Sequence, residues 1–252
     1  MFGRSARRVG AVAVIAAALA AWIAASGSPA AAAEQDGVSA EAGPGTKAAR
    51  AAPETAADRR FWSWFAAHDD MLFDWTWSAG DAERRERIFD QVEDELHQVD
   101  PQLYFVFGPK RADGKREFII TGEGRQRLVP VVQRLTRAAP PLDRWIIVAF
   151  RPRNPQPQGV RYQDIALCAC DASFTANRYG DKLQLSVFIP DGLMGRATTQ
   201  TAVMLLLHDV LGELDMMTYV RGVDIWGTSY ADPNSVLPIT SLPRFVDGVL
   251  KQ

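Results

Sequence analysis

Acidic residues and a histidine gather near the end of one apolar segment, where they could bind a metal ion or transfer protons. His208 is followed there by Glu213 and Asp215. A zinc-binding helix uses two histidines four residues apart, and this segment has only one. If the helix continued, His208 and Asp215 would lie two turns apart, too far for contact. We therefore expect a half-buried histidine and no metal site, and keep all three residues as weak site candidates.

The Thr-Gly-Glu-Gly sequence at 121–124 joins an expected strand to an expected helix, as the loop of a dinucleotide-binding fold does. Arg127 occupies the position of the third glycine, and Glu123 places negative charge where phosphate would sit. A simple turn explains both glycines. We expect no nucleotide and no other cofactor.

Other arrangements typical of catalysis are missing from the sequence. No serine lies in a Gly-x-Ser-x-Gly elbow. His68, Asp69 and Asp70 are consecutive on an expected helix, so their side chains point in different directions and His68 belongs to the buried stripe. We predict no catalytic residue.

The sequence contains two cysteines, Cys168 and Cys170. A bridge between residues so close is strained, and side chains two apart on a strand point the same way. Two thiols are also too few ligands for a zinc site. We expect two small buried residues in a strand, with a labile redox pair as the alternative.

Charge is unevenly distributed along the chain. Residues 58–109 carry 12 acids and 5 bases, whereas residues 110–161 carry 12 bases and 4 acids. Either these surfaces neutralise each other on packing, or both are solvated, or a basic surface binds a partner. The basic candidates flank the turn at 113–114 and are expected at one exposed hairpin tip. They are Lys110, Arg111, Lys115 and Arg116.

Two helices are expected to open the domain. Phe61, Phe65 and Leu72 belong to an apolar stripe in the first, and Ile88 and Val92 belong to one face of the second. Strands are expected at 103–107, 117–121 and 145–150, with a helix around Val132 before the third strand. Residues 154–159 are expected to form a linker.

The second half repeats this order, with strands expected at 164–170, 183–189 and 217–226. A helix that ends at Gly212 precedes the last of these strands, and a short helix is expected at 242–250. Each half is thus predicted to be a strand-strand-helix-strand unit. The fold class is α+β, with a mainly antiparallel sheet and helices on one face.

The N-terminus is typical of an exported protein. Arginines at 4, 7 and 8 precede an apolar run at 9–25 and a small-residue stretch that ends at Ala33. We expect a signal peptide at 1–33, a disordered Ala/Gly/Pro linker at 34–57 and one globular domain at 58–252. The protein is then periplasmic or secreted; an uncleaved N-terminal membrane anchor is the alternative.

Several short segments, taken in order, resemble a family of uncharacterised bacterial proteins, a domain of unknown function. They lie at 61–65, 107–110, 116–120, 145–153 and 211–215, and the likeness spans about 61–226. The resemblance implies a single folded domain. It implies no catalytic role for any residue.

The 28 basic residues are outnumbered by 30 acidic ones, and three arginines precede the cleavage site, so the mature chain is mildly acidic. Nucleic acid is excluded as a partner, because proteins bind its phosphate backbone through a basic surface. We expect a non-catalytic binding or interaction domain whose partner is an unidentified protein or small ligand. The alternative is a hydrolase whose site is assembled only in three dimensions.

Overall fold

The computed structural model of the chain describes residues 53–76 and 78–250. The expected signal peptide and most of the expected linker lie outside the described residues. Within the described part, no helix is long and apolar enough to cross a membrane.

The first helix, α2 (Ala56–Ala67), begins with a capping box. The Asp58 backbone N–H donates to the Thr55 hydroxyl at 3.2 Å, and the Thr55 N–H donates to the Asp58 carboxylate at 2.8 Å. The carboxylate also accepts a hydrogen bond from Arg134. Folded structure therefore begins at the end of the expected linker, slightly before residue 58.

Both N-terminal helices are present, and the first is interrupted. His68 ends α2 and precedes the short helix α3 (Asp69–Phe73). After a 3-10 turn, η1 (Ala79–Asp81), the second helix is α4 (Ala82–His97). The expected stripes are buried, except that His68 is only half-buried, with its Nδ1 2.8 Å from the Trp64 carbonyl oxygen.

A three-stranded sheet follows, in the order β1-β2-β3. Its strands are β1 (Tyr104–Lys110), β2 (Arg116–Thr121) and β3 (Trp145–Ala149). β1 and β2 form an antiparallel hairpin, whereas β3 runs parallel to β2. The connection from β2 to β3 passes through η2 (Gln126–Leu128) and helix α5 (Val129–Arg137), with Pro130 in the first turn of the helix.

The region between the two halves contains an unexpected hairpin. Strands β4 (Gly159–Tyr162) and β5 (Ile165–Cys168) pair antiparallel, so only part of the expected strand at 164–170 is correct. A 3-10 turn, η3 (Ala169–Asp171), follows β5. The strand after it was also not predicted: β6 (Ser173–Tyr179) is the true partner of the next strand.

The second half forms a four-stranded sheet in the order β8-β7-β6-β9. Strand β7 (Lys182–Ile189) is antiparallel to β6 and parallel to β8 (Val220–Gly227). Between β7 and β8 lie η4 (Asp191–Leu193) and helices α6 (Thr199–Leu211) and α7 (Glu213–Tyr219). The chain ends with η5 (Thr228–Tyr230), β9 (Leu237–Pro238), η6 (Ile239–Ser241) and α8 (Leu242–Leu250).

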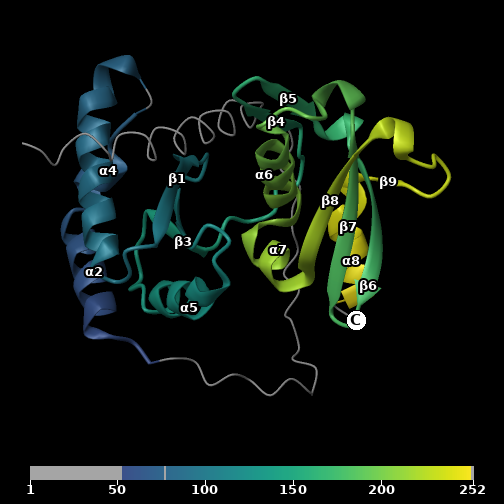
Figure 1. The fold of residues 1–252 in the computed structure, drawn as a ribbon. Helices are drawn as coiled ribbons and strands as arrows, with labels where there is room; N and C mark the ends of the chain where they lie inside the picture. The colour runs from purple at the N-terminus through teal and green to yellow at the C-terminus, as the bar shows by residue number, and fades with distance from the viewer. Residues whose placement is uncertain (1–52, 77, 251–252) are drawn as a thin grey trace, which may run out of the picture. The chain divides into compact units, whose positions relative to one another are not determined.

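The two halves therefore share one topology: an antiparallel hairpin, a helical connection and a third strand parallel to the second (Figure 1). Antiparallel pairs predominate, and the α+β prediction is confirmed. The three-stranded sheet packs against α2, α4 and α5 in one hydrophobic cluster, and the four-stranded sheet packs against α6 and α8 in a second, which also contains β5. Helix α7 contacts both clusters, through Leu214 and Met217 on one side and Met216 on the other.

Candidate functional site

A buried carboxylate lies where the two halves meet. Glu213, the first residue of α7, is only 1% exposed, and each of its carboxylate oxygens accepts two hydrogen bonds. Oε1 accepts from the backbone N–H groups of Gly122 and Gly124, at 3.1 and 3.0 Å. Oε2 accepts from the Thr121 hydroxyl at 2.6 Å and from the Arg151 N–H at 3.2 Å. These four contacts, termed the carboxylate clamp below, fully satisfy a buried anion.

Strand direction explains why the donors converge. β2 and β3 are parallel, so the loops that leave their carboxyl ends lie at the same edge of the sheet. Thr121 ends β2, and Arg151 follows β3 after Phe150, whose φ is positive at 65°. In the first loop, Glu123 and Gly124 also have positive φ. The N–H groups of Gly122 and Gly124 turn inward onto the carboxylate, whereas the Glu123 N–H between them donates to the Thr121 hydroxyl at 2.9 Å.

The loop at 121–124 therefore does bind an anion, and the anion is the protein's own Glu213 carboxylate. Its glycine pattern was expected to form only a turn, and the negative charge of Glu123 argued against phosphate. The sequence signal was present in the two glycines, since their N–H groups both donate to Glu213. The source of the anion could not be read from the sequence, because Glu213 is about ninety residues away along the chain.

Gly212 sets the direction of Glu213. It ends α6, as predicted, with φ 73° and ψ 160°, a conformation that essentially only glycine adopts. A Cβ at this position would lie 2.9 Å from the Arg153 nitrogen and 3.1 Å from the Arg151 carbonyl oxygen. The Glu213 N–H donates to that same carbonyl at 2.9 Å. The interruption between α6 and α7 at Gly212 therefore places the first residue of α7 in contact with the segment that follows β3.

Charged side chains surround the clamp. Glu123 forms ion pairs with Arg151 at 3.5 Å and with Arg125 at 3.7 Å. Burial raises the pKa of Glu123, although both arginines oppose this shift. The Nε atom of Arg151 is buried and has no hydrogen-bond acceptor within the part of the chain that the structure describes, and the buried Nη2 atom contacts Glu123 through the ion pair alone. Glu123 is therefore held closer to protonation than an exposed glutamate.

His208 lies next to this loop, on α6. A Cβ on Gly124 would lie 3.6 Å from its Cε1 atom. Burial lowers the pKa of His208; Glu213 opposes this shift, whereas Arg151 adds to it. The imidazole is consequently neutral at neutral pH and able to accept a proton.

Of the three weak candidates, the structure brings His208 and Glu213 together and separates Asp215. Because α6 ends at Leu211, the spacing argument based on a continuous helix does not apply. Asp215 accepts a hydrogen bond from Arg153 Nε at 2.8 Å, and Arg153 also binds Asp247 of α8. These contacts connect helices α7 and α8.

The hairpin tip at 110–116 has less unpaired positive charge than expected, because two of its basic side chains form ion pairs. Lys110 pairs with Asp74 at 3.1 Å, Arg111 pairs with Glu117 at 3.1 Å, and Lys115 is exposed. The expectation of exposure is wrong for Arg116, which is only 3% exposed.

Three contacts account for the burial of Arg116. Its guanidinium donates to the carbonyl oxygens of Gly108 and Phe73, at 2.8 and 3.0 Å, and lies 3.9 Å from the centre of the Trp75 ring. Burial lowers the pKa of Arg116 to about 10, against the attraction of Asp74. A role of the remaining tip residues in partner binding stays a prediction.

The charge asymmetry has a structural explanation. Acids of the first charge block (58–109) pair with bases of the second (110–161), which supports mutual neutralisation. The pairs are Asp58 with Arg134, Asp69 and Asp70 with Arg144, Asp74 with Lys110, and Asp100 with Arg127.

Exposed apolar side chains gather at the carboxyl end of β8. Trp226 is 45% exposed and Tyr230 is 75% exposed, with their ring centres 6.1 Å apart. Met194, also exposed, lies 3.6 Å from where a Cβ on Gly227 would be. Because Ile225 packs against the core, Trp226 points to the opposite face of the sheet. These three exposed residues, termed the aromatic face below, were not singled out from the sequence, where Trp226 was only part of a strand.

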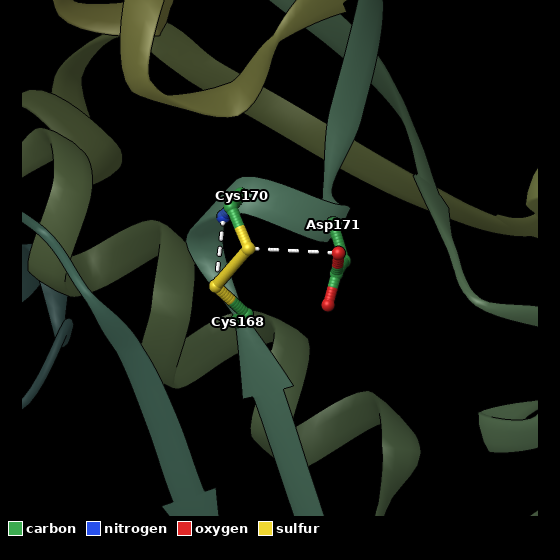
Figure 2. Close-up of side chains that lie close together, drawn as sticks. All are labelled: Cys168, Cys170 and Asp171. Carbon is green, nitrogen blue, oxygen red and sulfur yellow. Dashed lines mark hydrogen bonds between the residues drawn. A yellow bond between two sulfur atoms is a disulfide. The ribbon is translucent and has the colours of Figure 1, made fainter.

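The two cysteines do not have the expected setting. They form a disulfide, and Cys170 is exposed in η3 rather than buried in a strand (Figure 2). The two sulfurs and a carboxylate oxygen of Asp171 lie within 4.8 Å of one another. As long as the sulfurs are bonded to each other, they offer no thiolate to a metal ion. The packing interpretation is therefore wrong.

Comparison with protein-family models, with curated proteins and with solved structures finds no match to this chain.

Proposed function

We propose that this protein is a non-catalytic binding or interaction domain that works outside the cytoplasm, in the periplasm or as a secreted protein. The aromatic face is the observation that carries the proposal. Solvent-exposed Trp and Tyr side chains are enriched in binding surfaces, because they supply large contact areas at a low cost in conformational entropy. Trp226 and Tyr230 lie together on such a surface.

Polar neighbours complete this surface. Asp224 pairs with Ser186 across β7 and β8, on the same face as Trp226, and accepts a hydrogen bond from Gln184 at 3.0 Å. Beyond β8, the Asp191 carboxylate accepts from the Ser229 hydroxyl at 2.8 Å, which fixes the turn that carries Tyr230. An apolar centre with a polar rim is the usual composition of a protein interface.

Export is supported by two independent features. The N-terminal residues follow the order of a signal peptide, and the only two cysteines are bonded to each other. Disulfides persist in oxidising compartments outside the cytoplasm.

The proposal is tested by capture from the cell envelope with wild-type protein and with the double variant Trp226→Ala/Tyr230→Ala, quantified by mass spectrometry. We expect the double variant to lose the captured partners with little change in melting temperature, because both side chains are exposed. Tyr179→Ala is the matched control: Tyr179 is 54% exposed and lies at the opposite end of the sheet. Equal capture by the wild type and the double variant would refute a role for the aromatic face.

A hydrolase remains the second candidate, because one observation favours it. Burial raises the pKa of Glu123 and lowers the pKa of His208. Gly124 is near both: it follows Glu123 in the chain, and a Cβ on it would lie 3.6 Å from His208 Cε1. Titratable groups whose pKa values are shifted by burial are concentrated at active sites. If these groups transfer protons, Glu123→Gln and His208→Asn would each reduce the rate at which the protein hydrolyses a substrate that the wild type cleaves, by about 100-fold or more.

A further inference from the structure

The Cys168–Cys170 disulfide is exposed at a surface turn between β5 and β6. Cys168 is half-buried and Cys170 is exposed, so the bond is accessible from solvent. Only Ala169 separates the two cysteines, and the sequence contains no third cysteine. An incoming thiol therefore meets a single disulfide with no competing internal thiol.

This disulfide does little to hold the fold together. The stabilisation that a disulfide gives by restricting the unfolded chain grows with the length of the loop it closes, and here the two residues are only two positions apart. The turn is fixed by other contacts. The Ala169 N–H donates to the Gln158 carbonyl at 3.0 Å, and the Ala172 carbonyl accepts from the Ile239 N–H at 3.0 Å. Both alanines are buried in the second core.

The two sulfur atoms differ in their surroundings. The Cys170 backbone N–H donates to Cys168 Sγ at 3.2 Å, which favours negative charge on that sulfur. A carboxylate oxygen of Asp171 lies 3.5 Å from Cys170 Sγ and disfavours negative charge there. When the bond breaks, Cys168 is therefore the better leaving group, and Cys170, the more exposed of the two residues, carries the sulfur that an incoming thiolate attacks.

We propose that Cys168 and Cys170 form a thiol–disulfide exchange site whose substrates are dithiols, either small molecules or cysteine pairs of another exported protein. A substrate thiolate attacks Cys170 Sγ, the Cys168–Cys170 bond breaks, and Cys168 leaves as a thiolate that takes up a proton. The second substrate thiolate then attacks the substrate sulfur of the mixed disulfide and releases Cys170, which is protonated in turn. The dithiol is oxidised to a disulfide, and the protein disulfide gains two electrons and two protons. This activity does not depend on the aromatic face.

The first test follows exchange in the full chain with dithiothreitol and with glutathione as probes, by counting thiols after trapping with a maleimide reagent. We expect the bond to open and re-form reversibly across the glutathione potentials found outside the cytoplasm. Brief exposure to reduced glutathione should leave the adduct on Cys170. A disulfide that resists dithiothreitol in the folded protein, or an adduct found on Cys168, would overturn the proposal.

The second test separates an exchange site from a structural crosslink. Reduced and oxidised protein should melt within about 6 °C of each other, because the bond closes so short a loop. A much larger fall on reduction would mean that the disulfide is a structural element and would overturn the proposal.

Single-cysteine variants test the asymmetry. The alkylation rate of Cys168 in Cys170→Ser should reach half its maximum at a lower pH than that of Cys170 in Cys168→Ser, because the contacts argued above favour a thiolate at Cys168 and disfavour one at Cys170. Asp171→Asn should speed alkylation of Cys170 in the Cys168→Ser background and leave the melting temperature unchanged. Equal pH midpoints for the two cysteines, or no effect of Asp171→Asn, would contradict the assigned roles.

Discussion

At the scale of single residues, Glu123 and His208 show how the junction between the halves alters titration. Both are largely enclosed, and burial penalises whichever form is charged. The pKa of the glutamate therefore rises and that of the histidine falls, so the two values approach each other. Their effects on stability have opposite signs: Glu123 disfavours folding as pH rises through its raised pKa, and His208 disfavours folding as pH falls through its lowered pKa.

The histidine gives a pH-dependent prediction. The folded pKa of His208 lies below the unfolded value of 6.5, so between these values the unfolded chain binds a proton that the folded chain does not. Stability contributed by neutral His208 is therefore present above about pH 6.5 and is lost as pH falls through the folded pKa. Between about pH 8 and about pH 5, the free energy of unfolding measured in urea should fall more for the wild type than for His208→Asn. Glu123→Gln serves as the control of opposite sign, and parallel curves for wild type and His208→Asn would contradict the assignment.

Residue types alone identified His208 and Glu213 as candidates, but the sequence could not supply their geometry. Glu213 is bound by loops about ninety and sixty residues away, which only the sheet topology brings together. Arg116 illustrates the converse error. A charged residue beside a turn is normally exposed, and its burial depends on the Phe73 carbonyl and the Trp75 ring, both distant in sequence.

At the scale of secondary structure, periodicity was sufficient wherever an element carried a long apolar pattern. Helices α4 and α8 and strands β2 and β7 lie close to their predicted positions. Strands β4 and β6 were missed. β4 is short and follows a Pro- and Gln-rich stretch, and β6 ends in polar residues on an exposed part of the sheet. Such strands are specified by their partners more than by their own sequence.

The break between α6 and α7 gives the prediction at this scale. Gly212→Ala should destabilise the protein by about 1–3 kcal/mol or more, because φ is positive and a Cβ would collide with the backbone of Arg151 and Arg153. Gly248→Ala on α8 is the matched control, since nothing lies within 4 Å of its Cβ position. That change should be neutral or stabilise the helix by about 0.5–1 kcal/mol. Equal stability of the two variants in urea would show that the Gly212 conformation is not required.

At the scale of the whole described domain, two similar units are joined by polar and apolar contacts together. The carboxylate clamp connects α7 of the second half to both loops of the first. Leu214 and Met217 of the same helix pack on the first core. The repeated order of elements could be inferred from the sequence, whereas export stays a prediction. The way in which the halves are joined could not be inferred, because it depends on one buried glutamate and one glycine.

This arrangement predicts that the halves unfold together. Tryptophan fluorescence reports mainly on the first core, which contains Trp62, Trp75 and Trp145, and hydrogen exchange of β7 amides reports on the second. The two probes should give one midpoint in urea for the wild type.

Glu213→Ala leaves the buried donors of the first half without an acceptor, and should lower the free energy of unfolding by about 3 kcal/mol. If α7 couples the cores, both midpoints fall by the same amount, although the mutated residue belongs to the second half and its donors to the first. Glu83→Gln, at a side chain that is 88% exposed, is the control and should shift neither probe. A fall in the fluorescence midpoint alone would mean that the two halves unfold independently and that the clamp stabilises only the loops it binds.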